Sequence, residues 1–354
     1  MNVTDYMEAH GHEQLSVYTD PEAGLRAFIA IHDTTLGPAV GGVRIWPHRT
    51  EQEAIVDVLR LARGMTYKSA AAGLNMGGGK ALIIASAQDK SEAMMRAFGR
   101  FVDTLGGRYV TTEDVGATLR DLEHVAQETE YVVGLPVSQG GSGDPSIMTA
   151  FGIYRGMKAC ALDVWGSESL EGRTVALQGF GKVATRLAGH LTNERARLVV
   201  SEIDPAGLER ARQANLETLD DPSAIYDQEC DIFAPCALGG ILNDDTIPRL
   251  RCRIVAGAAN NQLLEDRHSS TLQSKGILYA PDYIINAGGV INISLEMEGE
   301  YDETLAAERT GRIYDTLQQV MDTARSRDIT TAQAADRLAE ERIEAVRRVK
   351  RIYL

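Results

Sequence analysis

Residues 172–204, GRTVALQGFGKVATRLAGHLTNERARLVVSEID, constrain the fold of this chain more than any other stretch. An apolar run leads into Gly179, Gly181 and Ala184 at the spacing GxGxxA, a helical pattern follows, and a second apolar run ends at Glu202. The first glycine suits a tight turn, the second lets a pyrophosphate approach the start of the helix, and the small alanine lets helix and strand pack closely. The order strand, turn, helix, strand predicts a Rossmann unit that binds a dinucleotide.

Glu202 bears on which dinucleotide is bound. It follows the glycines by roughly 20 residues, where a carboxylate can accept hydrogen bonds from the adenosine ribose. Its charge would repel a 2'-phosphate, so the sequence favours NAD over NADP. A solvated carboxylate at a strand end is the plainer alternative for Glu202 taken alone.

Three later segments repeat one scheme. Residues 230–244, 252–263 and 276–296 each contain a short apolar run that ends in small or amide residues. Ligands of a doubly wound parallel sheet bind outside the carboxyl ends of its strands, so these ends are the predicted floor of the cofactor site. Asn260 and Asn261 are either turn residues or amides that hydrogen bond to nicotinamide or substrate.

The first part of the chain alternates strand and helix patterns. We expect strands over 25–33 and 80–86 and helices over 50–73 and 91–107, which together predict a second α/β layer.

The turn-rich segment SQGGSGDPS at 138–146 is the predicted domain boundary. We therefore expect one domain over 1–146 and a Rossmann domain over 147–327. The polar C-terminal helix over 328–354 is expected to join the first domain, as a solvated or subunit-packing helix.

Composition narrows the class of protein. The 354 residues carry a net charge of -14, which argues against an extended nucleic acid surface. No apolar run approaches the roughly 20 residues of a membrane helix, and residues 1–15 lack the pattern of a secretion signal, so we expect a cytoplasmic protein. The four cysteines show no CxxC pair and no histidine at zinc spacing, so neither a metal site nor a disulfide framework is expected.

The segment GLNMGGGKALII at 73–84 places Lys80 directly behind three glycines and before an apolar run. The glycines could simply supply turns with positive φ. Alternatively, they let backbone and ligand approach closely, while Lys80, held against an apolar strand, becomes a reactive amine.

Six motifs occur in one order along the chain: GPAVGGVRIWP, RLARGMTYKSAAAGLNMGGGKA, TTEDVGAT, TAFGIYRGMKA, GAANNQL and NAGGVIN. Together they resemble the glutamate, leucine, phenylalanine and valine dehydrogenase family over nearly the whole length, with the strongest likeness to its leucine dehydrogenases. The resemblance implies two α/β domains, with the active site in the cleft between a substrate and oligomerisation domain over 1–146 and the Rossmann domain.

The resemblance also implies catalytic roles. Lys80 matches the lysine that activates water for attack on an imine carbon, Lys68 matches the lysine that holds the substrate α-carboxylate, and Asp114 matches the aspartate that moves protons at the amino group. A lysine serves as a base only when its pKa falls toward neutrality, through burial or a nearby cation, and Lys68 is a candidate for that cation. In isolation, Lys68 could be a surface lysine, and Asp114 could be a turn residue or a helix cap.

Substrate selection follows from what is missing. Glutamate dehydrogenases of this family grip the distal carboxylate with a lysine and a serine, whereas this chain has AVGGV at the first position and Ile293 at the second. Burying an unpaired carboxylate is costly, so a glutamate side chain is excluded. Val40, Met65, Val290 and Ile293 would instead line an apolar pocket, unless they are ordinary core residues.

The chain departs from the leucine dehydrogenase pattern at Lys182, Glu202 and Asp144, where asparagine, aspartate and asparagine are usual. The predicted substrate-binding residues are Lys68, Val40, Gly41, Met65, Asn260, Val290 and Ile293. The predicted cofactor-binding residues are Thr149, Gly179, Phe180, Gly181, Lys182, Val183, Ala184, Glu202, Ile203, Ala237, Ala258 and Asn260.

We thus expect NAD-dependent, metal-free interconversion of leucine, isoleucine and valine with their 2-oxo acids and ammonia, by a homo-oligomer that binds neither nucleic acid nor membrane. An aromatic or broad-range amino acid dehydrogenase is the alternative among enzymes. A noncatalytic NAD or amino acid sensor on the same fold is the alternative outside them.

Overall fold

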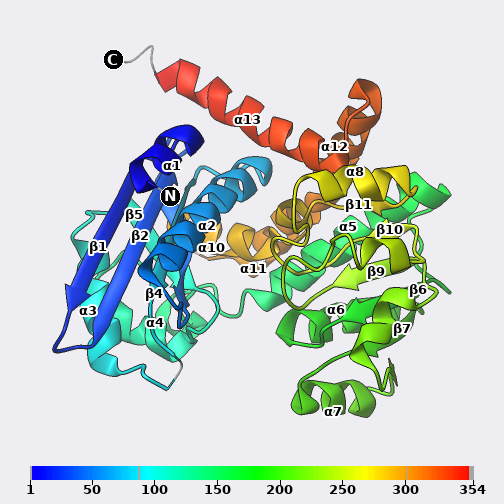
Figure 1. Ribbon diagram of the computed structural model, residues 1–354, viewed down its shortest axis with the longest axis horizontal. Helices are drawn as coiled ribbons and strands as arrows, with labels where there is room; N and C mark the ends of the chain where they lie inside the picture. Colours follow the sequence, from blue (N-terminus) through cyan, green and yellow to red (C-terminus); the bar gives the residue numbers. More distant parts are fainter. Residues whose placement is uncertain (1, 87, 300, 351–354) are drawn as a thin grey trace. The chain divides into compact units, whose positions relative to one another are not determined.

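The structure is a computed structural model that describes residues 2–86, 88–299 and 301–350 (Figure 1). The chain divides into two compact units, and the first crossing lies inside the predicted boundary segment 138–146. Unit 1 comprises Met1–Asp144, Ile293–Tyr301 and Ala339–Leu354, and unit 2 comprises Pro145–Asn292 and Asp302–Leu338. These limits differ from the predicted domains, because the C-terminal helix divides between the units and residues 293–301 group with unit 1.

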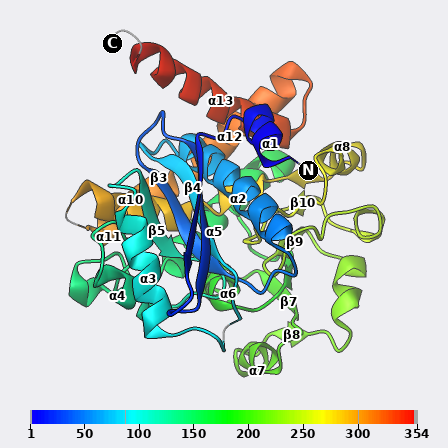
Figure 2. The same ribbon diagram turned by 60° about the vertical axis from the view of Figure 1, so that its left-hand side comes forward.

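Unit 1 is built on a five-stranded mixed sheet with the order β1-β2-β4-β3-β5 (Figure 2). β1 and β4 each run antiparallel to β2, while β3 runs parallel to both β4 and β5. The strands are β1 (Gln14–Asp20), β2 (Leu25–Asp33), β3 (Ala39–Ile45), β4 (Gly77–Ile83) and β5 (Tyr109–Glu113).

Helices cover both faces of this sheet because β2 is apolar on both sides. Phe28 and Ala30 pack with residues of α2, whereas Ile29 and Ile31 pack with α3 and α4. The period of two in a strand places alternate residues on opposite faces. The helices are α1 (Val3–His10), α2 (Glu51–Ala71), α3 (Glu92–Asp103) and α4 (Leu119–Ala126).

The expected strand over 80–86 begins earlier than predicted, at Gly77, so the three glycines lie inside β4. The turn interpretation of these glycines is wrong. A Cβ on Gly78 would lie 2.2 Å from the backbone nitrogen of Thr66 and 2.6 Å from the carbonyl oxygen of Ala62. The glycine therefore lets α2 pack directly on the strand that carries Lys80.

Unit 2 contains a six-stranded sheet in the order β11-β10-β9-β6-β7-β8, and all of its paired strands are parallel. The predicted strand, turn, helix and strand of residues 172–204 form β6, the glycine turn, α6 and β7. The strands are β6 (Thr174–Gln178), β7 (Arg197–Ser201), β8 (Glu217–Thr218), β9 (Ile232–Pro235), β10 (Ile254–Val255) and β11 (Leu278–Tyr279).

The helices of unit 2 include two that begin or end outside it. α10 (Gly288–Glu298) and α13 (Thr331–Lys350) each divide between the units. The NAGGV motif at 286–290 leads into α10, so only residues 278–279 of the predicted strand segment 276–296 are β structure. The other helices are α5 (Ser146–Trp165), α6 (Lys182–Asn193), α7 (Pro205–Gln213), α8 (Arg267–Ser274), α9 (Asp282–Ile285), α11 (Glu303–Gly311) and α12 (Ile313–Arg327).

The part of α13 that belongs to unit 1 is anchored to the end of α2. The Arg342 guanidinium donates to the carbonyl oxygens of Leu74 at 2.6 Å and Gly73 at 2.9 Å, and to the Asn75 side chain at 3.0 Å. Cationic donors suit the unpaired carbonyls beyond a helix C-terminus. This half of the helix is therefore packed within the unit rather than simply solvated.

Candidate active site

Lys80 and Asp114 form a buried ion pair in unit 1. Lys80 points from β4, where the residue is 5% exposed, and its Nζ lies 3.0 Å from Oδ2 of Asp114, which follows β5. Arg44 of β3 donates from Nε to the same oxygen at 3.1 Å. Within the described chain, Oδ1 of Asp114 makes no hydrogen bond, so it is the oxygen available to an incoming amino group.

Each member of the pair has a shifted pKa. Burial is the largest cause and lowers the pKa of Lys80, the Asp114 carboxylate opposes that effect, and the Arg44 guanidinium adds to it. Burial would raise the pKa of Asp114, but the charges and hydrogen bonds of Lys80 and Arg44 outweigh it and lower the value to about 2. The prominent cation beside Lys80 is thus Arg44, which is not among the predicted site residues.

Glycines in β3 create the room for this pair. A Cβ on Gly42 would lie 2.7 Å from Cβ of Asp114, and a Cβ on Gly41 would lie 1.8 Å from the Gly79 carbonyl oxygen. The Gly41 carbonyl accepts a hydrogen bond from the Tyr109 hydroxyl at 2.5 Å. Any larger residue at these positions would push β3 away from the strands that carry Lys80 and Asp114.

The other predicted substrate residues of unit 1 come from α2, β3 and α10. Lys68 and Met65 are half-buried in the last two turns of α2, and Val40 is fully buried in β3. Ile293 is 3% exposed, and its Cγ2 lies 4.0 Å from the point that a Cβ on Gly134 would occupy. Gly134 therefore lies beside both the predicted substrate residue Ile293 and Thr112, and neither Gly134 nor Thr112 is among the predicted site residues. Val290 belongs to unit 2 and is half-buried.

The glycine turn of unit 2 has the features that a pyrophosphate requires. Gly179 has φ of +95°, and a Cβ there would lie 2.8 Å from Cβ of Ala237. A Cβ on Gly181 would meet no described atom within 4 Å, so the space above this residue is open. In the described chain, Gly181 begins α6 without a side-chain cap, which leaves backbone N–H groups for an anion. The buried Ala184 packs the helix onto the sheet.

Glu202 is held in place by backbone donors. Its carboxylate accepts from the N–H groups of Phe180 at 2.5 Å, Ile203 at 2.7 Å and Asp204 at 2.9 Å. The Phe180 carbonyl in turn accepts from Arg210 at 3.3 Å. Since a carboxylate offers about four acceptor sites, this leaves little capacity for a ribose hydroxyl. Glu202 is thus not simply a solvated carboxylate, because it fixes the glycine turn.

Amides meet at the carboxyl end of β10. Asn286 donates to Oδ1 of Asn260 at 2.8 Å and to the Ala258 carbonyl at 3.0 Å, while its own Oδ1 is buried with no partner among the described residues. Oε1 of Gln178, at the end of β6, is likewise buried and unpartnered in the described chain. These acceptors fit a ligand that carries N–H or O–H donors, as a nicotinamide dinucleotide does. Asn261 has φ of +51°, as expected of a turn residue.

The remaining predicted cofactor residues also belong to unit 2. Thr149 lies in the first turn of α5, and its hydroxyl lies 2.9 Å from the point that a Cβ on Gly289 would occupy. Ile203 is 80% exposed beside Glu202. Lys182 and Ala237 are exposed, and Val183 and Ala258 are half-buried.

The described residues contain neither a candidate metal centre nor a candidate membrane span. No group of three or more histidine, cysteine, aspartate or glutamate side chains there is placed to hold a metal ion. Among the same residues, every helix is too short or too polar to span a bilayer.

Comparison with known proteins places these features in a family. Residues 12–131 match the model of the Glu/Leu/Phe/Val dehydrogenase dimerisation domain, and residues 204–352 match that of glutamate/leucine/phenylalanine/valine dehydrogenase. The leucine dehydrogenase of Thermoactinomyces intermedius is 54% identical over 100% of this chain and 97% of the relative. The chain belongs to the Glu/Leu/Phe/Val dehydrogenase family. It is an amino acid dehydrogenase.

Amino acid dehydrogenases with other names are also similar to the chain. The phenylalanine dehydrogenase of T. intermedius is 45% identical over 100% of this chain and 97% of its own length. The crystal structure of L-tryptophan dehydrogenase from Nostoc punctiforme is 46% identical, covers 98% of this chain and 99% of its own, and superposes with a TM-score of 0.82. The resemblance to the family and the two-domain α/β fold are confirmed. Because dehydrogenases named for different amino acids are similar to this chain, the fold alone does not identify the substrate.

Proposed function

We propose that this amino acid dehydrogenase oxidises leucine, isoleucine and valine with NAD to 2-oxo acids and ammonia, and catalyses the reverse amination. The observation that carries the proposal is the buried pair of Lys80 and Asp114 in a chain 54% identical to a leucine dehydrogenase. A protein that only sensed NAD or an amino acid would have no use for a desolvated lysine beside a carboxylate.

The chemistry divides among three residues. When bound, NAD supplies the two-electron oxidant. Lys68 would hold the substrate α-carboxylate, and Oδ1 of Asp114 would accept and return a proton at the substrate nitrogen. Lys80 in its neutral form would take a proton from the water that attacks the imine carbon, after which ammonia leaves. Lowering the pKa of Lys80 by burial enlarges the neutral fraction at working pH.

NAD rather than NADP follows from Glu202. The carboxylate stands beside the exposed Ile203 and next to the glycine turn, where a 2'-phosphate would meet its negative charge. Gly181, the uncapped start of α6 and the unpartnered amide oxygens of Gln178 and Asn286 would hold the rest of the dinucleotide. Lys182 would add a positive charge near the pyrophosphate.

The preference for branched aliphatic substrates rests on the predicted contacts of Val40, Met65, Val290 and Ile293 with the substrate side chain. An aromatic substrate is the alternative, favoured by the 45% and 46% identities to a phenylalanine and a tryptophan dehydrogenase. The higher identity to leucine dehydrogenase favours the aliphatic class.

We also propose that the chain forms a homo-oligomer in a reducing compartment such as the cytoplasm. The match to a dimerisation domain over 12–131 supports assembly, and the four cysteines are free thiols. Light scattering on the purified protein tests the subunit count, and a monomeric mass would contradict the proposal.

The test of substrate class is kcat/KM for NADH formation across leucine, isoleucine, valine, phenylalanine, tryptophan and glutamate. We expect kcat/KM for the three aliphatic substrates to differ by at most roughly 200-fold, the upper limit of the effect of one methylene group. Oxidation of glutamate should be barely detectable. Val290→Ala should improve phenylalanine relative to leucine by adding volume. A parent enzyme that prefers phenylalanine or tryptophan would replace the aliphatic assignment with the aromatic one.

A further inference from the structure

Arg44 connects the catalytic pair to a second carboxylate on α2. Its Nε donates to Oδ2 of Asp114 at 3.1 Å, and its Nη1 donates to Oδ2 of Asp57 at 3.2 Å. Nε2 of His48 lies 3.2 Å from that same Asp57 oxygen. The side chains of Arg44 and Asp57 are only 20% and 28% exposed, so water screens these contacts partially.

These two hydrogen bonds let Arg44 bridge the segment after β5 and α2. Arg44 lies on β3, Asp114 follows β5, and Asp57 lies on α2. A guanidinium spans two carboxylates because its donors form a rigid fork, whereas the single ammonium of a lysine is a point charge. Asp57 therefore holds the far side of the fork while the near side orients Asp114.

The charge of Arg44 acts on Lys80 as well. A guanidinium stays protonated at every working pH, so it is the permanent cation beside a lysine that must lose its proton to act as a base. Arg44 lowers the pKa of Lys80, and Asp57 raises it. Within this ion pair, Arg44 therefore favours the neutral form of Lys80, whereas Asp57 favours its protonated form.

We propose that Arg44 is a positioning residue that aims Asp114 at the substrate nitrogen and, through its permanent charge, favours the neutral amine of Lys80. This inference rests on the proposed deamination. The other ionisable groups that face Lys80 or its partners are Asp114, which follows β5, Tyr109 of β5, Asp57 of α2 and His48, which precedes α2. Tyr109 stays a neutral phenol because burial raises its pKa.

The test is the pH profile of kcat/KM for leucine oxidation in three variants. Arg44→Gln should shift the rising limb to higher pH and lower kcat roughly 10-fold or more, the effect of losing a hydrogen bond to a charged group. Asp57→Asn should shift the limb to lower pH, because it removes a charge that favours the ammonium. Arg44→Lys should keep the limb near the parent position yet still lose turnover, since one ammonium cannot span both carboxylates. Leucine itself titrates identically in every assay, so differences report on the enzyme.

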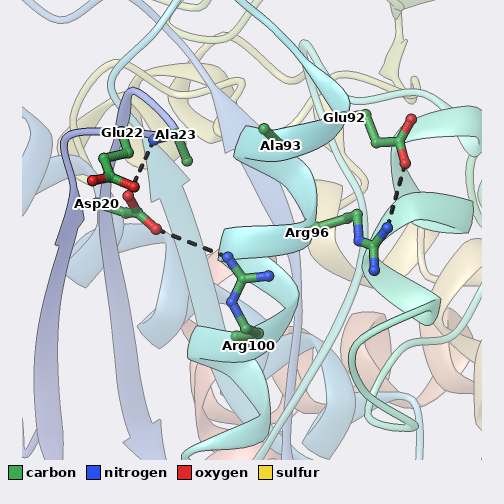
Figure 3. A pocket seen from close by; sticks show the side chains of 7 residues that line it. All are labelled: Asp20, Glu22, Ala23, Glu92, Ala93, Arg96 and Arg100. Atoms are coloured by element: carbon green, nitrogen blue, oxygen red, sulfur yellow. Dashed lines mark hydrogen bonds and ion pairs between the residues drawn. The ribbon is translucent and has the colours of Figure 1, made fainter.

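A matched control comes from another arginine of unit 1. Arg100 lines a surface pocket of about 560 Å³, where it faces Asp20 and lies near Arg96 on α3 (Figure 3). Arg100→Gln removes the same charge from a half-exposed ion pair and should leave the profile unchanged. If Arg44 had only a structural role, the variants would lose stability or turnover. The rising limb of the pH profile would then not shift to higher pH in Arg44→Gln and to lower pH in Asp57→Asn.

A second readout separates this inference from the proposed function. Competitive acetylation of Lys80 by acetic anhydride, followed by peptide mass analysis against pH, reports the titration of the amine without any turnover. If the parent fails to oxidise leucine, the proposed function is wrong, and the acetylation profile still judges Arg44. An unchanged Lys80 profile in Arg44→Gln, or shifts of the same sign in Arg44→Gln and Asp57→Asn, would overturn the inference. If Arg44→Gln does not fold, Arg44→Lys and Asp57→Asn still decide the question.

Discussion

Replacing Gly78 with alanine should displace α2 from the strand that carries Lys80. The added Cβ would lie 2.2 Å from the Thr66 backbone nitrogen and 2.6 Å from the Ala62 carbonyl oxygen, whereas ordinary contacts begin at 3.4 Å. The difference of 3.4 - 2.2 = 1.2 Å cannot be absorbed by a side-chain rotation, because both atoms are backbone. We expect α2, which carries Lys68, to move by about 1 Å, and a misplacement of that size can cost roughly 100-fold in rate.

The stability cost of Gly78→Ala follows from the same contact. Overpacking costs about 1–3 kcal/mol, and each kcal/mol lowers Tm by about 2–4 °C in a domain of this size, so Tm should fall by about 2–12 °C. Gly64→Ala is the matched control on α2, the helix that packs on Gly78, since Gly64 is exposed and a Cβ there meets no described atom within 4 Å. It should be neutral or stabilising by up to about 1 kcal/mol. A Gly78→Ala protein with the Tm and leucine kcat/KM of the parent would refute the close-packing account.

Three further outcomes are expected. Lys80→Ala should lose at least about 100-fold in turnover while still folding and binding NADH, and a turnover within tenfold of the parent would refute its role as the base. Lys68→Ala should mainly raise KM, because the contact with the substrate carboxylate exists both before and during the reaction. An unchanged KM would refute the role of Lys68. Glu202→Ser should erode the NAD preference and weaken NADH binding, since the Phe180 N–H loses its acceptor; equal use of both cofactors by the parent would contradict this. Burial lowers the pKa of His32 from 6.5 to about 4, so the unfolded state takes up its proton first, and the neutral imidazole contributes stability above pH 6.5 that is lost as pH falls toward 4. Between pH 6.5 and 4, the free energy of unfolding measured with urea should fall by about 3 kcal/mol more in the parent than in His32→Asn. Parallel plots of this free energy against pH for the two proteins would contradict the prediction.

Local signals carried the Rossmann prediction. Gly179, Gly181 and Ala184 occupy the turn and the start of α6 as expected, because a tight turn after a strand depends on neighbouring residues alone. The apolar alternation of β2 likewise matches residues 25–33 from end to end.

Features that depend on distant residues were not predictable from the sequence pattern. The role of Gly78 is set by Thr66 and Ala62 on another element, so a run of glycines could equally be read as a turn. The role of Arg44 was not predictable because its partners Asp57 and Asp114 are distant in sequence. They come together only when α2, β3 and β5 pack.

Glu202 shows a third limit. Its place after β7 was foreseen, and its assignment to the cofactor stays a prediction, but three backbone N–H groups around its carboxylate emerge only when the turn folds. The domain limits differ for a similar reason, since α10 and α13 are continuous helices whose residues divide between two compact units.

The most direct test of the account is the product balance of a single reaction of the parent protein with leucine and NAD. We expect NADH, ammonia and the 2-oxo acid of leucine to form in equal amounts, and Lys80→Ala to form little of any product over the same time. NADH formation without ammonia, or full product formation by Lys80→Ala, would contradict deamination through the buried Lys80 amine.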